Sequence, residues 1–427
     1  MNIQKRYIDS LDETLYSAVH ETGLRIYVIP KKGFSKTYAI YGTKFGSVNN
    51  SFIPLGETEG VLVPDGVAHF LEHKLFEQPD GTNAFDEFSK YGANANAFTT
   101  FTNTCYLFSC TNHFEECFSH LLSYVQEPYF TKENIEKEQG IIGQEIRMYD
   151  DDGEWVLMFN MLRALYHNNP VRIDIAGTVE SISQIDKDVL YNCYNTYYNP
   201  ANMVVAVAGD VDPDKVFEIV GKTVKNRENG KVTSIYPEEP LSVCQPYIEA
   251  RSSVARPLFN IGFKDNHLKT GDELVKREAQ IKLLLKIMFG KSSKFYNENY
   301  DSGLINDTFG DDVMTELSFS CAALGGECDK PELLRDKILA TIESYRASGF
   351  DEKEFSRIKK SYFGSFIRTF NKVDSIGNLI CRNYLNDVDI MSFPEIYSSI
   401  TAESLKSVLD EVFSEKTCVL SVVKPID

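Results

Sequence analysis

The chain has 427 residues, of which 43% are hydrophobic and 25% charged, as in soluble globular proteins, and this length predicts two or more packed domains. A net charge of −18 argues against a nucleic acid or an anionic membrane as partner, because phosphate groups are bound by clusters of Lys and Arg. No run approaches the roughly 18 apolar residues that span a bilayer. The N-terminal residues lack the pattern of a secretory signal, and the nine scattered cysteines are typical of reduced thiols, so we expect a cytoplasmic protein.

Strand and helix patterns alternate along the first half of the chain. Residues 24–31 alternate apolar and polar side chains as a strand does, and residues 37–45 and 203–208 are apolar enough for buried strands. Residues 94–111 are rich in Thr, Phe and Tyr and predict two further strands. Apolar spacings of three and four residues predict helices over residues 65–78, 114–125, 132–149, 154–166 and 182–197.

The end of the chain repeats the order of elements found earlier. Residues 402–413 predict a helix and residues 417–423 a strand, as residues 182–208 do in the first half. This repetition suggests an α+β fold of two homologous domains, each a mostly antiparallel sheet with helices packed on one face. We place the domains at residues 1–225 and 246–427, with a polar linker that contains Gly and Pro at residues 226–245.

One segment of the predicted helix at residues 65–78 carries catalytic chemistry: His69-Phe70-Leu71-Glu72-His73. The two histidines are four residues apart, so their rings project from one face and can reach the same zinc ion. Glu72 lies near that face and can take a proton from water that the metal acidifies. The alternative is an amphipathic helix whose polar face happens to hold two histidines. The flanking apolar residues favour the metal, since two unpaired histidines buried with them would be costly.

A catalytic zinc site needs a third protein ligand and an open position for water. The predicted helix at residues 132–149 offers Glu138 and Glu145, which are two helical turns apart and therefore share a face. We predict that Glu145 is the ligand and that Glu138 holds a histidine N–H or assists catalysis. Glu133 and Glu136 point elsewhere and are interpreted as solvated surface charges.

The motif together with Glu145 in a Glu-x6-Glu pair resembles the pitrilysin/insulinase family of zinc peptidases, whose motif order His-x-x-Glu-His is inverted relative to most zinc peptidases. The likeness extends over nearly the whole chain, through residues 92–99, 171–182, 198–203 and 289–305. It is strongest towards the bacterial branch in which a subunit with the motif is paired with a homologous subunit that lacks it.

The resemblance implies two homologous domains with six-stranded sheets, and two polypeptides that close around a chamber for peptides. It implies one Zn²⁺ per chain, held by His69, His73 and Glu145, with Glu72 as the base and Glu138 as the supporting catalytic glutamate. It also implies that substrate adds a β-strand to the sheet edge, at the residues Asn96, Ala97, Phe98 and Thr99. An ordinary strand residue without a ligand remains the alternative for Asn96.

The chain departs from the family at two positions in its second half. Active single-subunit relatives offer the substrate an Arg and a Tyr seven residues apart, where this sequence has Asn299 and Asn306, with Tyr300 beside the first. Asn is short and uncharged, so we expect a homologous inactive subunit to supply the pair in a heterodimer; a homodimer is also possible. The alternative function is a non-catalytic peptide-binding or assembly subunit, but the retained ligand residues favour a metalloendopeptidase. General peptide degradation and processing of one dedicated peptide are both compatible with the sequence.

Overall fold

The computed structural model describes residues 1–227 and 230–426, which form two compact units. Unit 1 consists of three stretches of chain: Met1–Ile146, Asp174–Tyr236 and Phe366–Met391. Unit 2 consists of the three others: Arg147–Ile173, Pro237–Ser365 and Ser392–Asp427. Each unit thus includes a stretch from the other half of the sequence, and the chain passes from unit 1 to unit 2 after Tyr236, within the predicted linker. The homology of residues 1–225 and 246–427 stays a prediction.

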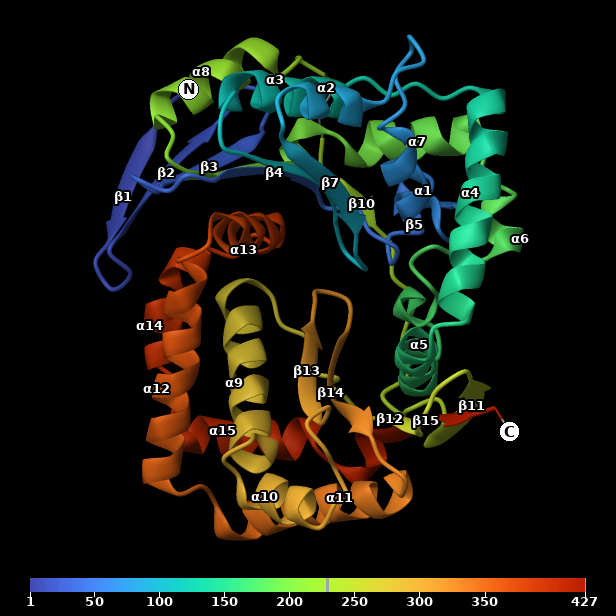
Figure 1. Ribbon diagram of the computed structural model, residues 1–427, viewed down its shortest axis with the longest axis vertical. Coiled ribbons are helices and arrows are strands. Elements are labelled where there is room, and N and C mark those ends of the chain that lie inside the picture. Colours follow the sequence, from blue (N-terminus) through green and yellow to red (C-terminus); the bar gives the residue numbers. More distant parts are fainter. Residues whose placement is uncertain (228–229, 427) are drawn as a thin grey trace. The chain divides into compact units, whose positions relative to one another are not determined.

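Unit 1 is built on a twisted sheet with seven strands among the described residues (Figure 1). In spatial order the strands are β1 (Gln4–Ile8), β2 (Glu13–Val19), β3 (Arg25–Pro30), β9 (Met203–Gly209), β4 (Thr37–Thr43), β8 (Thr104–Cys110) and β7 (Asn94–Thr99). Among the described strands of this sheet, only β3 and β9 pair in parallel. A small second sheet contains β10 (Thr233–Ser234), β5 (Ser51–Ile53) and β6 (Val61–Leu62).

Helices cover both faces of the seven-stranded sheet. The helices of unit 1 are α1 (Val67–Lys74), α2 (Ala84–Lys90), α3 (Phe114–Val125), most of α4 (Lys132–Asp150), α6 (Val179–Ile182), α7 (Lys187–Tyr197), α8 (Pro213–Thr223) and α13 (Val373–Leu385). Strand side chains alternate between faces, so Tyr41 of β4 joins the core on one face, whereas Tyr38 and Ile40 face Gly377 of α13 on the other. The C-terminal segment that contains α13 therefore completes the N-terminal sheet.

Unit 2 has a sheet with five strands among its described residues: β11 (Tyr247–Ser252), β15 (Cys418–Pro425), β12 (Leu258–Lys264), β14 (Ser320–Glu327) and β13 (Gly310–Thr315). Its helices are α5 (Gly153–Leu165), α9 (Gly271–Phe289), α10 (Lys294–Asp301), α11 (Pro331–Ser348), most of α12 (Glu352–Thr369), α14 (Phe393–Ser398) and α15 (Ala402–Val412). Short 3₁₀ helices occur in both units, at Pro170–Arg172, Pro200–Asn202, Ile390–Ser392 and Glu415–Thr417. The predicted α+β class with two sheet-containing domains is confirmed. The sheets have seven and five strands among the described residues in place of six each, and helices cover both faces of the sheet of unit 1 in place of one.

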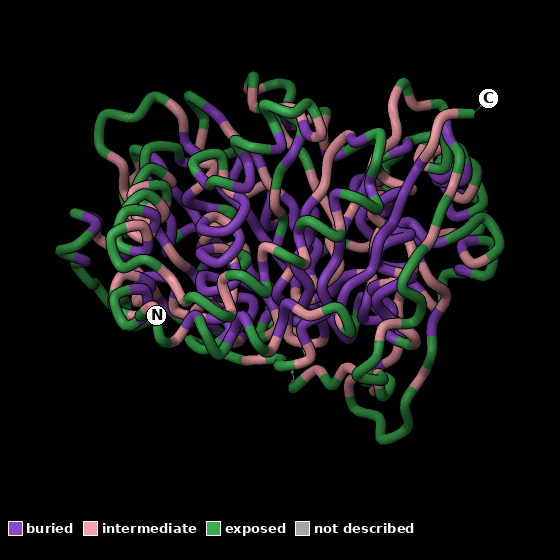
Figure 2. Tube along the Cα trace, turned by 90° about the horizontal axis from the view of Figure 1, so that it is seen from below, coloured by how far each residue is buried: buried purple, intermediate pink, exposed green. Residues whose placement is uncertain are grey.

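The patterns of burial explain which elements were predicted from the sequence. The central strands β4 and β9 are buried along their whole length, and Figure 2 shows buried segments inside and exposed turns outside.

The predicted helix at residues 182–197 is two helices, because the side chain of Asp186 accepts hydrogen bonds from Asp188 N–H and Val189 N–H and so begins a new helix there. No helix in the described part of the chain is both long and apolar enough to cross a membrane.

Candidate metal centre and active site

The start of α1 is fixed by a glycine. Gly66 has a φ of 89°, and a Cβ added to it would lie 2.4 Å from the carbonyl oxygen of Ala176. Its own carbonyl accepts the N–H of Phe70 at 2.9 Å and so begins the helix. From this start α1 buries Val67, Ala68, Phe70 and Leu71 in the core of unit 1. The face with His69 and His73 is consequently turned toward α4.

The structure brings the three predicted metal ligands together. His69 Nε2 lies 3.7 Å from Glu145 Oε1, and His73 Nε2 lies 3.6 Å from Glu145 Oε2. The rings of His69 and His73 are 4.6 Å apart between centroids. Ligand atoms bound to one zinc ion at about 2.0–2.2 Å in a tetrahedron are roughly 3.3–3.6 Å apart, so the spacing fits the ion. Within the described residues this is the one group of three ligating side chains with atoms within 4.8 Å.

The surroundings of His69 favour the neutral form that a metal requires. Its side chain is largely buried, and its Nδ1 has no hydrogen-bond partner among the described residues. Burial, and next the neighbouring His73, lower the pKa of His69 to about 3. A neutral imidazole keeps the lone pair that binds a metal, so the buried ring is suited to this role.

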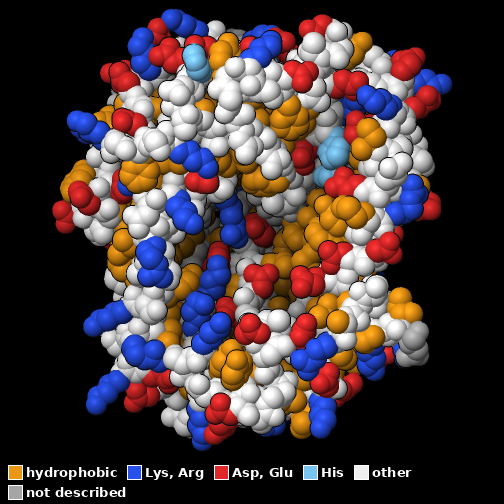
Figure 3. Space-filling view, viewed as in Figure 1, with side chains coloured by type: hydrophobic (Ala, Val, Ile, Leu, Met, Phe, Trp, Pro, Cys, Tyr) orange, Lys and Arg blue, Asp and Glu red, His pale blue; other side chains and the backbone are white. Residues whose placement is uncertain are grey.

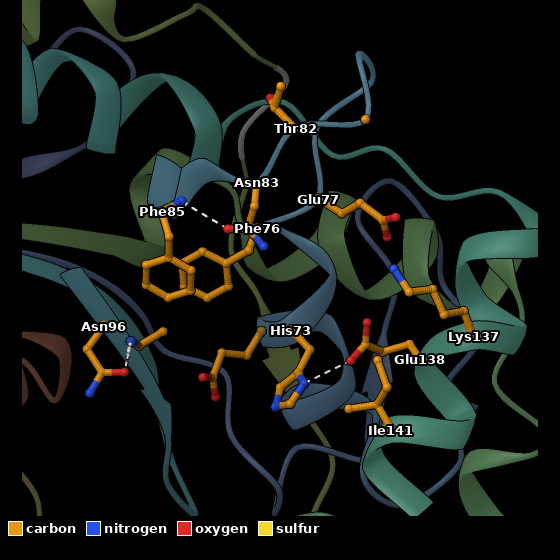
Figure 4. A pocket seen from close by; sticks show the side chains of 13 residues that line it. His73, Phe76, Glu77, Thr82, Asn83, Phe85, Asn96, Lys137, Glu138 and Ile141 are labelled. Carbon is orange, nitrogen blue, oxygen red and sulfur yellow. Dashed lines mark hydrogen bonds and ion pairs between the residues drawn. The ribbon is translucent and has the colours of Figure 1, made fainter. Parts of the chain in front are cut away.

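The second histidine is oriented by Glu138, one of the predicted site residues. Glu138 Oε1 lies 3.0 Å from His73 Nδ1, and this contact is drawn in Figure 4. Burial would lower the pKa of His73, but the hydrogen bond to Glu138 and the carboxylates of Glu72 and Glu145 raise it. Burial would raise the pKa of Glu138, but the contacts of Glu138 with His73 and Lys74 hold this pKa below its usual value. A carboxylate at Nδ1 leaves Nε2 of His73 free to face Glu145.

Glu72, the predicted base, is almost fully buried at 7% exposure. Its Oε2 accepts a hydrogen bond of 2.6 Å from the hydroxyl of Thr99 on β7. Burial raises the pKa of Glu72, although the Thr99 hydrogen bond and His73 oppose the change. A carboxylate with a raised pKa holds a proton more readily, which suits a group that must accept a proton and release it again.

A cavity of about 450 Å³ opens beside these residues, between α1, α4 and β7. Its apolar wall consists of Phe76 and Phe85, whose rings stack with centroids 4.2 Å apart (Figure 4). Glu72, His73 and Glu138 also line the cavity, so a molecule bound in it would touch the residues predicted to act in catalysis and metal binding. Figure 3 shows histidine and acidic side chains at the surface over α1 and α4, so the site is accessible.

The four predicted substrate-binding residues lie in β7, the last strand of its sheet. Among the described residues β7 pairs only with β8, so its other edge has no strand partner. Asn96 and Ala97 line the cavity, and the side-chain oxygen of Asn96 accepts the N–H of Ala97. An added substrate strand there stays a prediction.

Some groups around the site were not predicted from the sequence. Thr99 was predicted through its strand, but its hydroxyl also holds Glu72. Phe76 and Phe85 belong to the pocket, and Lys74 is buried next to Glu138. The sequence shows only that Lys74 stands between His73 and the apolar pair Leu75-Phe76, which does not predict that Lys74 is buried.

The two asparagines singled out in the second half of the chain are engaged inside unit 2. Asn299 is 3% exposed; its Nδ2 donates to the carbonyl of Phe295 at 2.7 Å, and its Oδ1 accepts from Lys337 Nζ at 3.0 Å. Asn306 Nδ2 donates to Glu327 Oε2 at 2.8 Å. Both side chains thus have internal partners, which leaves them poorly suited to bind a substrate carbonyl.

Two family profiles match the chain in succession. The profile of insulinase (peptidase family M16) matches residues 63–179, which include both histidines and Glu145. The profile of the peptidase M16 inactive domain matches residues 184–362.

Known proteins resemble the chain over its whole length. The chain is 43% identical over 425 residues to a Bacillus subtilis protein named as the uncharacterized zinc protease YmfH, covering 97% of this chain and 98% of the relative. It is 25% identical over 427 residues to the zinc protease PqqE of Helicobacter pylori, and the match covers 96% of this chain and 92% of that protein. The crystal structure of an M16-like peptidase from Alicyclobacillus acidocaldarius matches with a TM-score of 0.93 and 31% identity, over 100% of this chain and 99% of that one. The fold, the full-length likeness and the assembled His-His-Glu cluster agree, and the chain belongs to the insulinase (M16) family of peptidases.

Proposed function

We propose that the chain is a zinc-dependent metalloendopeptidase that hydrolyses peptides or unfolded segments, acting as the catalytic subunit of a heterodimer. The observation that carries the proposal is the meeting of His69, His73 and Glu145 at zinc-compatible spacing with the buried carboxylate of Glu72 beside them. An assembly subunit without catalysis has no need for this complete set of groups.

The residues present fit a zinc ion, and His69, His73 and Glu145 would hold one per chain. A zinc ion bound there supplies a Lewis acid that polarises a peptide carbonyl and makes water more acidic. Glu72 accepts the proton of the attacking water and returns it to the leaving amine. Thr99 fixes the carboxylate of Glu72, and Glu138 fixes the ring of His73.

The substrate would be held by two features of unit 1. An extended peptide can add to the free edge of β7, where backbone hydrogen bonds give affinity with little demand on sequence. The cavity with Phe76 and Phe85 can then take an adjacent apolar side chain. This combination favours a broad range of peptides that enter as extended segments.

The test is cleavage of a fluorogenic peptide library by the full chain, without and with a chelator and after zinc is restored. We expect internal cleavage that the chelator abolishes and zinc recovers. Cleavage that is insensitive to chelation, or stoichiometric peptide binding without any cleavage in the presence of a homologous subunit, would contradict the proposal. The second result would favour the non-catalytic assembly role.

A further inference from the structure

The last residue of α1, Lys74, is completely buried, although it carries a charge. Its ammonium group forms an ion pair with Glu77 and donates to the carbonyl oxygen of Asn134 at 3.2 Å. It also lies 3.7 Å from Glu138 Oε2, which is an ion-pair contact too long for a hydrogen bond. Burying an ammonium group is costly unless it is paired, so its place next to the active-site glutamate calls for an explanation.

Lys74 and the metal centre are connected through the two oxygens of one carboxylate. Glu138 Oε2 faces Lys74, whereas Glu138 Oε1 binds His73 Nδ1 at 3.0 Å. His73 in turn presents Nε2 to Glu145 at 3.6 Å. A carboxylate held at both oxygens cannot rotate freely, so the cation on one side fixes the acceptor that the histidine uses on the other.

We propose that Lys74 is a positioning residue of the metal site, which holds Glu138 so that Glu138 keeps His73 in the metal-binding orientation. The inference rests on the metal site of the proposed function. The competing explanation is structural: Lys74 would serve only Glu77, Asn134 and the C-terminus of α1, where a cation is favourable. The two explanations differ in what removal of the charge does to metal affinity.

The variant Lys74→Met keeps most of the length of the side chain and removes the charge. We expect its Kd for zinc, measured by competition with a chromogenic chelator, to rise about 10-fold. This is the lower end of the loss in metal affinity that follows removal of a group that orients a metal ligand. Replacement of zinc by cobalt(II) should give a changed absorption spectrum in the variant, which a merely structural role would leave as in the wild type.

A matched control exists in unit 2. Lys264 is also buried, at 1% exposure, and is paired with Glu239. Lys264→Met should lower thermal stability as Lys74→Met does but leave zinc affinity unchanged. Glu77→Gln, which removes the other carboxylate partner of Lys74, should also leave zinc affinity within about twofold of wild type, since Glu138 keeps its contact with Lys74.

A double-mutant cycle decides whether Lys74 acts through Glu138. In the Glu138→Gln background, Lys74→Met should change the zinc Kd less than about twofold, because the carboxylate that transmits the effect is gone. If Lys74→Met does not fold, Lys74→Gln takes its place in the cycle, since it also removes the charge but keeps a polar group at the buried position. An unchanged Kd in Lys74→Met, or an equal effect in both backgrounds, would overturn the inference. Failure of the wild-type chain to bind zinc would instead remove the proposed function on which it rests.

Discussion

At the scale of single residues, the roles of Glu72 and His73 can be separated, although the two are adjacent. Glu72 is buried and its carboxylate is held by the Thr99 hydroxyl, whereas His73 Nε2 faces Glu145. We expect Glu72→Gln to bind zinc as the wild type does and to lose about 10²–10⁴-fold in kcat, the usual contribution of a general base. Metal analysis and peptide cleavage on the same preparation check this, and a fully active variant would remove Glu72 from the mechanism.

His73→Ala should lose the metal itself. Removal of one of three protein ligands leaves His69 and Glu145 only, so we expect less than one-tenth of the wild-type zinc content after dialysis. His267→Ala is the control, because His267 is a half-exposed histidine of unit 2 outside the cluster. Zinc retained by His73→Ala at the wild-type level would show that the cluster is not the binding site.

The sequence predicted that His69, His73 and Glu145 lie together, because their arrangement depends largely on local helix geometry. His69 and His73 share a face in any helix, as do Glu138 and Glu145, so the sequence spacing alone predicts that the members of each pair lie on the same side of their helix. The contact between Thr99 and Glu72 could not be predicted, because it depends on how a strand packs beside a helix. The same holds for the stacking of Phe76 on Phe85.

At the scale of elements, strands that are apolar along their whole length were the most predictable. Residues 203–208 were predicted as a strand and lie in β9, and residues 417–423 were predicted as a strand that the structure begins one residue later, at Cys418 of β15. The packing of α13 was not predicted. Its sequence shows an apolar face, but it does not show that this face would cover β4 and β9 of the other half of the chain.

The position of α1 depends on Gly66, so a change there should affect both stability and the metal site. Gly66→Ala places a Cβ at positive φ and against the carbonyl oxygen of Ala176, and we expect a loss of about 1–3 kcal/mol in the free energy of unfolding. Gly364→Ala is the matched control, since nothing lies within 4 Å of an added Cβ in α12, and it should stabilise by about 0.4–1 kcal/mol. Urea unfolding measures the stability of both variants. If Gly66→Ala and Gly364→Ala had equal effects, Gly66 would not be the residue that fixes the start of α1.

In unit 2, a buried ion pair joins Asp265, the residue after β12, to Arg277 of α9, and it predicts that the stability of the fold depends on pH. Asp265 is 2% exposed and accepts hydrogen bonds from Arg277 Nη2 at 2.8 Å and Nε at 3.0 Å. Burial would raise the pKa of Asp265, but the Arg277 guanidinium holds it below the usual value. A lowered folded-state pKa stabilises above the unfolded pKa of about 3.9, and this stabilisation is lost as pH falls through the folded value.

Asp265→Asn should therefore cost about 3 kcal/mol at neutral pH, because it leaves Arg277 with Glu411 as its charged partner. The difference from wild type should shrink as pH falls below about 4. Asp336→Asn removes an exposed carboxylate beside Arg335 and should leave the stability nearly unchanged. Chemical unfolding at several pH values tests this, and a difference that is independent of pH would show that the charge of Asp265 is not the cause.

At the scale of the whole molecule, the chain combines the predicted metal ligands in unit 1 with asparagines in unit 2, at the two positions where the family resemblance leads us to expect Arg and Tyr. Asn299 and Asn306 are occupied by internal hydrogen bonds, so they are poor substitutes for donors to a substrate carbonyl. We therefore propose that a second polypeptide supplies the donors to the substrate carbonyl.

We therefore expect the purified chain alone to bind zinc but to cleave peptides slowly. A homologous subunit that carries the Arg and Tyr should raise kcat/KM about 100-fold, the usual effect of one donor to a developing oxyanion. Replacing both residues in the homologue should abolish the gain while sedimentation still shows a heterodimer, which separates catalysis from assembly. If the isolated chain is as fast as any mixture, or a homodimer is fully active, the partner is unnecessary and unit 2 must provide the donors through other residues, of which the exposed Tyr300 is the first to replace.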